Sequence, residues 1–314
     1  MRKWEKVTLS IASLFIVLGV GYGVYLYKSV ESTANSIYEP RNPIPAVTNI
    51  DGGQQTDTAA IYEKIADQEP FSVLLLGVDE RANDVGRSDT MVVLTVNPGK
   101  HSILMFNIPR DTRTEIIGRG TVDKINHAYA FGGVNMSIQT VENLLGSPID
   151  YYVKVNMEGF SSIIDLLGGV SVNNPFYFTY EGKVFEQGNI QLTGEEALLF
   201  SRMRYDDPRG DLGRNARQRE ILQELMNNAL QVSSVTKIQN ILGEVVNNVK
   251  TDITFDEMKQ FIKDYRSDLK NIETIEIQGH GQRINGIYYY IVDEQERERV
   301  QNLMKEHLRR VDTP

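Results

Sequence analysis

The chain has 314 residues, a formal net charge of −9 at pH 7 and a pI near 5.1. This acidic balance argues against a general nucleic-acid binder, which needs a basic surface. The sequence contains no cysteine, and this excludes disulfides, thiolate metal sites and cysteine nucleophiles.

An uncharged apolar segment, Val7–Tyr27, lies near the N-terminus. As a helix rising about 1.5 Å per residue it would span roughly 30 Å, the thickness of the hydrocarbon core of a bilayer. Arg2, Lys3 and Lys6 precede it, so we expect residues 1–6 to stay in the cytoplasm and the rest of the chain to lie outside the cell. The segment is longer than the core of a typical signal peptide and ends in tyrosines. The sequence therefore predicts a single-pass transmembrane anchor rather than a cleaved signal peptide.

Residues 28–69 are polar and rich in Pro, Gly, Gln and Thr. This composition is typical of a spacer rather than of a packed domain. From residue 70 onwards apolar runs return, and no internal repeat is visible. We therefore expect an extracytoplasmic spacer at 28–69 and one folded domain at 70–314.

Three apolar runs at the start of this domain predict β-strands: Phe71–Asp79, Thr90–Asn97 and Ser102–Pro109. The first run is continuous, as in a strand that is covered on both faces. If the strands form an antiparallel meander, the end of the first, the start of the second and the end of the third meet at one edge of the sheet. This arrangement would bring Asp79, Asp89 and Arg110 together.

Further along the chain, helical and strand-like patterns alternate. The helical patterns lie at Val134–Gly146, Met157–Gly169, about Leu212–Leu230 and from Asp293, and the strand patterns at Asp150–Asn156 and Asn271–Gly279. Thr193 and Glu196 have the spacing of a capping box at the start of a helix. The alternation predicts a layered α/β domain.

The segment Phe200–Glu220 holds six arginines and no lysine within an acidic chain. One interpretation is a solvated helix face with internal salt bridges, because acidic residues lie among the arginines. The other is a site that clamps phosphate or pyrophosphate through bidentate guanidinium contacts. Arg202 and Arg204 would reach one ligand if the backbone between them is extended. Arg214 and Gln218, four residues apart, share one face of a helix.

Other polar residues have a plain structural alternative beside a functional one. Asp79 and Asp89 could be ordinary loop acids, or they could bind Mg²⁺, which often takes one or two carboxylates and keeps several waters. Arg110 could pair with a neighbouring acid, and Lys124 could be a surface lysine. Asp211 could be the N-cap of the following helix.

Several segments resemble motifs of the LytR–CpsA–Psr family: LLLGVDER, GRSDTMVVLTVNP, NIPRDTRTEI, DKINHAYAFGG, IDYYVKVN and SRMRYDDPRGDLGRNARQRE. The apolar N-terminal segment resembles the membrane anchor of that family. The likeness is strong over about residues 70–230, where several ordered motifs at compatible spacing are more specific than any one alone. Within the family, the chain is similar to the wall teichoic acid ligases of Gram-positive bacteria.

The resemblance implies an α/β sandwich in which helices flank a central mixed β-sheet, with an apolar pocket for a polyprenyl chain. It also implies a membrane-anchored, extracytoplasmic phosphotransferase. Such an enzyme would take an anionic glycopolymer, here wall teichoic acid, from an undecaprenyl-pyrophosphate carrier. It would attach the polymer to the C6 hydroxyl of N-acetylmuramic acid in peptidoglycan.

The site residues of the family match positions of this chain. Asp79 and Asp89 match the aspartates that hold Mg²⁺, for which Mn²⁺ could substitute. The positions that match pyrophosphate-binding or neighbouring polar residues are Arg87, Arg110, Lys124, Arg202, Arg204, Arg214 and Gln218. We expect Arg110, Asp89 and Asp211 to act in catalysis, and either aspartate could accept the proton of the acceptor hydroxyl. Apolar side chains from the helices after Val134 would line the lipid pocket.

Three other functions stay open at this point. A hydrolase would admit water to the same site and release free polymer phosphate. A non-catalytic polyprenyl-phosphate-binding protein would leave polymer attachment independent of Arg110. A DNA-binding regulator would need a cytoplasmic domain, which the predicted topology and the acidic charge disfavour.

Overall fold

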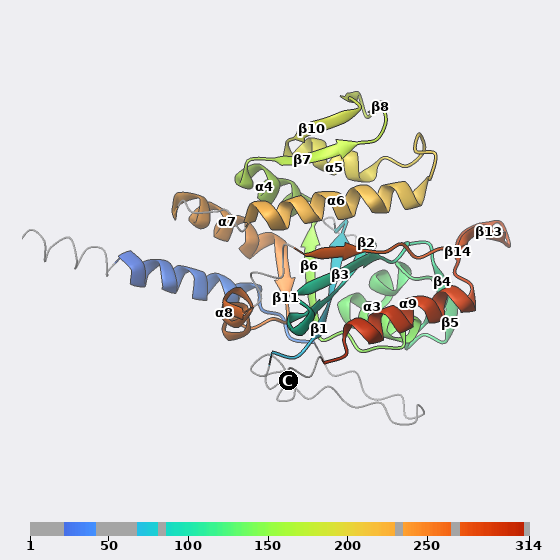
Figure 1. The fold of residues 1–314 in the computed structure, drawn as a ribbon, viewed down its shortest axis with the longest axis horizontal. Coiled ribbons are helices and arrows are strands. Elements are labelled where there is room, and N and C mark those ends of the chain that lie inside the picture. Colours follow the sequence, from blue (N-terminus) through green and yellow to red (C-terminus); the bar gives the residue numbers. More distant parts are fainter. Residues whose placement is uncertain (1–21, 42–67, 81–85, 230–234, 265–270, 311–314) are drawn as a thin grey trace, which may run out of the picture.

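A six-stranded mixed sheet forms the centre of the computed structural model (Figure 1). The structure describes residues 22–41, 68–80, 86–229, 235–264 and 271–310. In sheet order the strands are β11 (Val249–Thr251), β6 (Tyr151–Asn156), β1 (Phe71–Val78), β2 (Ser88–Asn97), β3 (Ser102–Asn107) and β12 (Ile272–Thr274). The pairs β1–β2 and β2–β3 are antiparallel, whereas β6 runs parallel to β1 and β12 parallel to β3. The predicted meander and the mixed sheet are therefore confirmed.

Helices cover both faces of this sheet (Figure 1). One face packs against α3 (His127–Leu145) and α9 (Glu294–His307), and the other against α6 (Asp211–Ala229) and α8 (Phe255–Asp264). Alternate residues of β1 serve the two sides, so that Leu74 and Leu76 face α3 while Phe71 and Val73 face the opposite layer. Burial of both faces explains why this strand is a continuous apolar run in the sequence.

A third apolar cluster lies beyond α6. It joins α6 to α4 (Met157–Leu167), α5 (Gly194–Arg202) and two strand pairs, β7 (Val170–Asn174) with β10 (Gly188–Leu192) and β8 (Phe178–Tyr180) with β9 (Lys183–Phe185). The helix α7 (Val235–Asn248) packs beside α4. The capping box of Thr193 and Glu196 opens α5 as predicted, and α4 ends at Gly168, whose φ of 99° is accessible to glycine at little cost.

The structure differs from the expected elements at several places. The helix α3 begins at His127, but non-helical backbone at Gly132 and Gly133 divides it into two parts. The second part matches the helix expected at Val134–Gly146. The strand expected at Asn271–Gly279 is reduced to β12. Two pairs that the sequence patterns did not predict are β4 (Arg113–Ile116) with β5 (Thr121–Lys124) and β13 (His280–Ile284) with β14 (Ile287–Ile291).

The described N-terminal residues form a helix over residues 22–37, drawn in blue in Figure 1. Its C-terminal part buries Ala34 and Ile37 against the domain, and Arg41 Nε lies 2.6 Å from Asp252 Oδ2. The start of the predicted spacer thus packs on the domain. Residues 1–21 and 42–67, with most of the predicted anchor and spacer, lie outside the described residues. Within the described ranges, no helix combines the length and apolar character needed to cross a bilayer.

Candidate functional site

The edge of the sheet brings the two candidate metal ligands together. The carbonyl oxygen of Arg87 accepts hydrogen bonds from the backbone N–H of Asp79 at 3.3 Å and of Asp89 at 3.1 Å. Gly86 makes this close return of the chain possible, because a Cβ there would lie 2.2 Å from the Asp79 carbonyl oxygen and its φ is +70°. Both aspartates line the cavity described next, whereas the side chain of Arg87 is exposed and outside its lining.

A cavity of about 570 Å³ lies between the sheet and the layer formed by α4, α5 and α6. Most of its wall is apolar and includes Leu75, Val92, Val153, Val155, Met157, Phe160, Ile163, Leu198, Leu222 and Leu225. The helix α3 does not contribute, because it packs on the opposite face of the sheet. The expectation that the helices after Val134 supply the wall is therefore only partly right: β1, β2 and β6 provide a large share.

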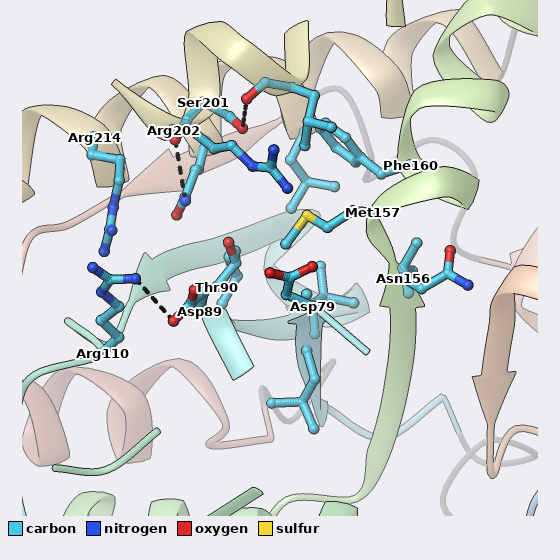
Figure 2. A pocket seen from close by; sticks show the side chains of 18 of the residues that line it. Asp79, Asp89, Thr90, Arg110, Asn156, Met157, Phe160, Ser201, Arg202 and Arg214 are labelled. Carbon is cyan, nitrogen blue, oxygen red and sulfur yellow. Dashed lines mark hydrogen bonds and ion pairs between the residues drawn. The ribbon is translucent and has the colours of Figure 1, made fainter. Parts of the chain in front are cut away.

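Charged groups gather at one end of this cavity (Figure 2). The charged or amide side chains in the lining are Asp79, Asp89, Arg110, Asn156, Arg202, Arg204, Arg214 and Gln218. Arg110 and Arg214 point toward each other in Figure 2, and Asp89 lies beside Arg110. The cavity therefore combines an apolar interior with a cationic mouth, which is formed by Arg110, Arg202, Arg204 and Arg214.

Arg202 and Arg204 reach this mouth because the chain changes conformation between them. The helix α5 ends at Arg202, and Met203 has φ −57° and ψ 135°, which is extended backbone. The Met203 side chain is fully buried on the other side. Alternation along extended backbone then places both arginines in the cavity wall, as the sequence predicted.

Arg214 forms an ion pair with Asp211, but two of its nitrogens make no hydrogen bond to any described residue. Its side chain is only 6 % exposed, and Nη2 lies 2.8 Å from Asp211 Oδ1 without the geometry of a hydrogen bond. Among the described residues, the buried atoms Nε and Nη2 of Arg214 and Nε of Arg110 have no hydrogen-bond partner. Burial and the nearby Arg110 lower the pKa of Arg214, although Asp211 opposes this shift. Two facing cations with unpaired donors form a site for an anion.

The remaining catalytic candidates lie close by. Asp89 Oδ1 is 2.9 Å from Arg110 Nη1 and also accepts a hydrogen bond from Asn126 Nδ2 at 3.3 Å. Burial acts to lower the pKa of Arg110, but the carboxylates of Asp89 and Asp111 outweigh it and raise that pKa. Asp211 is the first residue of α6, where the helix dipole favours a negative charge.

The donor set at this end fits a divalent cation bound together with a substrate. No three His, Cys, Asp or Glu side chains gather as a metal cluster within the described part of the chain. The carboxylates of Asp79 and Asp89 both face the cavity. Mg²⁺ commonly takes one or two carboxylates and completes its shell with waters and phosphate oxygens, so two aspartates beside an anion site suit it.

The predicted residue Lys124 and a further arginine of the arginine-rich segment, Arg217, lie outside the lining of the cavity. Lys124 Nζ is 2.7 Å from Asp111 Oδ1, which places it behind Arg110. Arg217 points into the protein, where its guanidinium donates to the carbonyl oxygens of Phe200 and Met203 and to the carboxylate of Asp207. The arginine-rich segment therefore holds both kinds of residue: some line the cavity, and others bind the end of α5.

Sequence patterns also missed residues at the mouth. Tyr205 is 84 % exposed, lines the cavity and lies under the guanidinium of Arg204, 4.5 Å from its ring centroid. Thr90 and Ser201 also line the cavity. Tyr205 directly follows the Arg202–Arg204 pair, and this adjacency was a usable signal. Thr90 and Ser201 carried no signal, because small hydroxyl residues are common in strands and helix ends.

Comparisons with known proteins identify the family of the chain. The model of the LytR_cpsA_psr family matches residues 24–306. A Halalkalibacterium halodurans protein named polyisoprenyl-teichoic acid–peptidoglycan teichoic acid transferase TagU is 52 % identical over 291 residues, which cover 92 % of this chain and 93 % of that protein. The crystal structure of Bacillus subtilis TagU is 47 % identical with a TM-score of 0.63, covering 78 % of this chain and all of that one.

A structure described as TagT bound to LI-WTA is 31 % identical to this chain with a TM-score of 0.66, covering 77 % of this chain and 92 % of that one. The family match spans most of the chain and includes every residue of the cationic mouth. The chain belongs to the LytR–CpsA–Psr family.

Proposed function

We propose that this protein transfers teichoic acid from a polyisoprenyl carrier to peptidoglycan. The single observation that carries the proposal is the pair of facing guanidinium groups at the mouth of an apolar cavity. Arg110 and Arg214 each keep buried nitrogens without a hydrogen bond to any described residue. A lipid pyrophosphate has the matching shape, with an anionic head for the mouth and a hydrocarbon tail for the interior. Relatives at 46 % and 52 % identity carry the name of this activity.

The proposed donor is an undecaprenyl-pyrophosphate-linked polymer, and the proposed acceptor is the C6 hydroxyl of N-acetylmuramic acid. The acceptor oxygen attacks the phosphorus that bears the polymer. The bond from that phosphorus to the bridging oxygen breaks, and undecaprenyl phosphate leaves. Phosphoryl transfer of this kind depends mainly on positioning and charge stabilisation.

The arginines supply that stabilisation. Arg110 and Arg214 would bind the phosphate oxygens from opposite sides, and Arg202 and Arg204 would complete the cationic mouth. Bidentate guanidinium contacts hold a phosphate in a fixed orientation and neutralise the charge that grows on the leaving group. Lys124, paired with Asp111, would add positive charge from behind Arg110 rather than by direct contact.

Asp79 and Asp89 would hold Mg²⁺, or Mn²⁺, which supplies further neutralisation of the diphosphate when bound. Asp89 is then engaged by the cation and by Arg110. Asp211 pairs with Arg214 but would not also hold the cation, so it is the proposed base that accepts the proton from the acceptor hydroxyl. The side chain of Arg87, exposed beside residues outside the described set, would contact the polymer side of the donor.

The predicted N-terminal anchor places the reaction at the outer face of the cell membrane in this proposal. Both substrates are found there, since the carrier lipid is membrane-bound and peptidoglycan lies outside.

The test is product analysis with the full chain, a lipid-linked donor and peptidoglycan. Polymer joined covalently to glycan strands supports the proposal, and Arg110→Ala should abolish it. Free polymer phosphate formed at the same rate with and without peptidoglycan would instead identify a hydrolase. Lipid binding with no turnover would identify a binding protein.

A further inference from the structure

A series of hydrogen-bonded polar side chains runs from Glu276, which follows β12, to the cavity. Glu276 Oε1 accepts a hydrogen bond from Arg219 Nη2 at 2.8 Å, and Arg219 Nη1 donates to Asn107 Oδ1 at 3.2 Å. Asn107 Nδ2 in turn donates to Gln218 Oε1 at 3.1 Å. Gln218 lines the cavity, whereas Asn107 and Arg219 are buried, at 2 % and 7 % exposure.

The guanidinium of Arg219 fixes the direction of the two hydrogen bonds that follow it, from Arg219 to Asn107 and from Asn107 to Gln218. A guanidinium can donate but not accept, so the amide of Asn107 must turn its oxygen toward Arg219. Its NH₂ group then faces Gln218, which must turn its own oxygen toward Asn107. The NH₂ group of Gln218 is left on the other side. One of its hydrogens reaches the Ser201 carbonyl oxygen at 3.5 Å, and the second has no partner within the described residues.

We propose that Arg219 and Asn107 are positioning residues, which hold the side-chain amide of Gln218 with an N–H directed at the pyrophosphate of the donor. This inference rests on the proposed function, because it assumes that the anion binds at the mouth of the cavity. A rotated amide would present a carbonyl oxygen to the same anion and repel it. We call the series Glu276, Arg219, Asn107 and Gln218 the relay. It fixes, before the ligand binds, that the NH₂ group of Gln218 and not its carbonyl oxygen faces the phosphate.

In this relay, the neighbouring residues Gln218 and Arg219 of α6 have different roles because they face different sides of the helix. Gln218 faces the cavity, while Arg219 lies on the adjacent side of the helix against the end of β3. Arg219 thus acts through Asn107 and not by touching the ligand. Its partner Glu276 has a second, looser contact with the exposed Arg209, whose Nη1 lies 3.5 Å away.

The decisive variant is Asn107→Asp. It keeps an acceptor for Arg219 but replaces the NH₂ donor with a second oxygen, so the amide of Gln218 should rotate. We expect the dissociation constant for geranylgeranyl pyrophosphate, measured by calorimetry with the full chain, to rise at least about tenfold. The melting temperature should not fall, because the buried guanidinium gains a full carboxylate. A purely structural role of Asn107 would lower stability and affinity together.

A new carboxylate could also repel the anion directly, and a double-mutant cycle separates the two effects. In a Gln218→Ala background, Asn107→Asp should cause no further loss of affinity if it acts through the amide. Additive losses would overturn the relay and leave plain repulsion. The control Arg209→Gln touches the same glutamate from the exposed side and should leave affinity unchanged.

The outcomes distinguish this inference from the function on which it rests. If the wild-type chain does not bind geranylgeranyl pyrophosphate, with or without Mg²⁺, the proposed function and the relay both fail. If the wild-type chain binds and Asn107→Asp binds equally well, the relay alone is wrong.

Discussion

Arg214 and Arg217 lie about one turn apart on α6 and are both buried, but their replacement by methionine should have opposite effects on stability. Arg217 is fully engaged, with bonds to two backbone carbonyl oxygens and to Asp207. Arg214 has two buried nitrogens that make no hydrogen bond within the described part of the chain. We therefore expect Arg217 to stabilise the folded state, and Arg214 to bind the ligand while lowering the stability of the folded state.

The magnitudes follow from these contacts. Breaking a buried ion pair by removing one partner costs about 3–5 kcal/mol, and roughly 2–4 °C of melting temperature accompanies each kcal/mol in a domain of this size. Arg217→Met should therefore lower the melting temperature by about 10 °C. Buried unsatisfied donors cost about 1–3 kcal/mol, and burial holds the pKa of Arg214 down in spite of Asp211. Arg214→Met also removes the ion-pair partner of Asp211, but that carboxylate stays at the N-terminus of α6, where the helix dipole favours it. The melting temperature should therefore stay unchanged or rise.

Activity should show the reverse order. A hydrogen bond to a charged group is worth about 1.5–3 kcal/mol, so the loss of two of them from Arg214 should reduce kcat/KM at least about 100-fold. Arg217→Met should keep most of its activity at temperatures where it remains folded. Thermal unfolding by calorimetry and the transfer assay on the same preparations measure both quantities. If Arg214→Met unfolds as early as Arg217→Met and still transfers polymer at the wild-type rate, the reasoning is refuted.

Further predictions concern the cation, the cavity and the C-terminal helix. Asp79→Asn should raise the Mg²⁺ concentration needed for half-maximal transfer at least about tenfold, and an unchanged requirement would exclude it as a ligand. Leu222→Trp should narrow the cavity, so that a short prenyl pyrophosphate still binds while an undecaprenyl one does not; equal loss of both would argue against a lipid site there. Burial lowers the pKa of His307 to about 4. The folded protein therefore favours the neutral imidazole. The resulting contribution to the free energy of unfolding, about 3 kcal/mol, is present above pH 6.5 and is lost as the pH falls toward 4. The free energy of unfolding of His307→Gln should lack this dependence on pH. If it falls between pH 6.5 and 4 as steeply as in the wild-type protein, the assignment to His307 is wrong.

Much of the fold was present in the sequence because strand direction and local periodicity are properties of the chain itself. The apolar runs before Asp79 and after Asp89, with a turn before the third run, were enough to predict that both aspartates meet Arg110 at one edge. The capping box of Thr193 and Glu196 is a contact between neighbours and needs no tertiary information. The spacing of Arg202 and Arg204 showed only that both could reach one ligand if the backbone between them is extended.

Only the tertiary structure decided which arginines face the cavity. Arg214 and Arg217 have the same chemistry and almost the same position on one helix, and the difference between them is which neighbours pack against each side of it. The residues that line the cavity could not be identified from the sequence either, because Leu and Val have the same sequence periodicity in a lipid pocket as in a hydrophobic core. The contact between Asn107 and Gln218 joins distant positions, so no local pattern could reveal it. The sequence determined which chemistry was available, and packing determined where each side chain could use it.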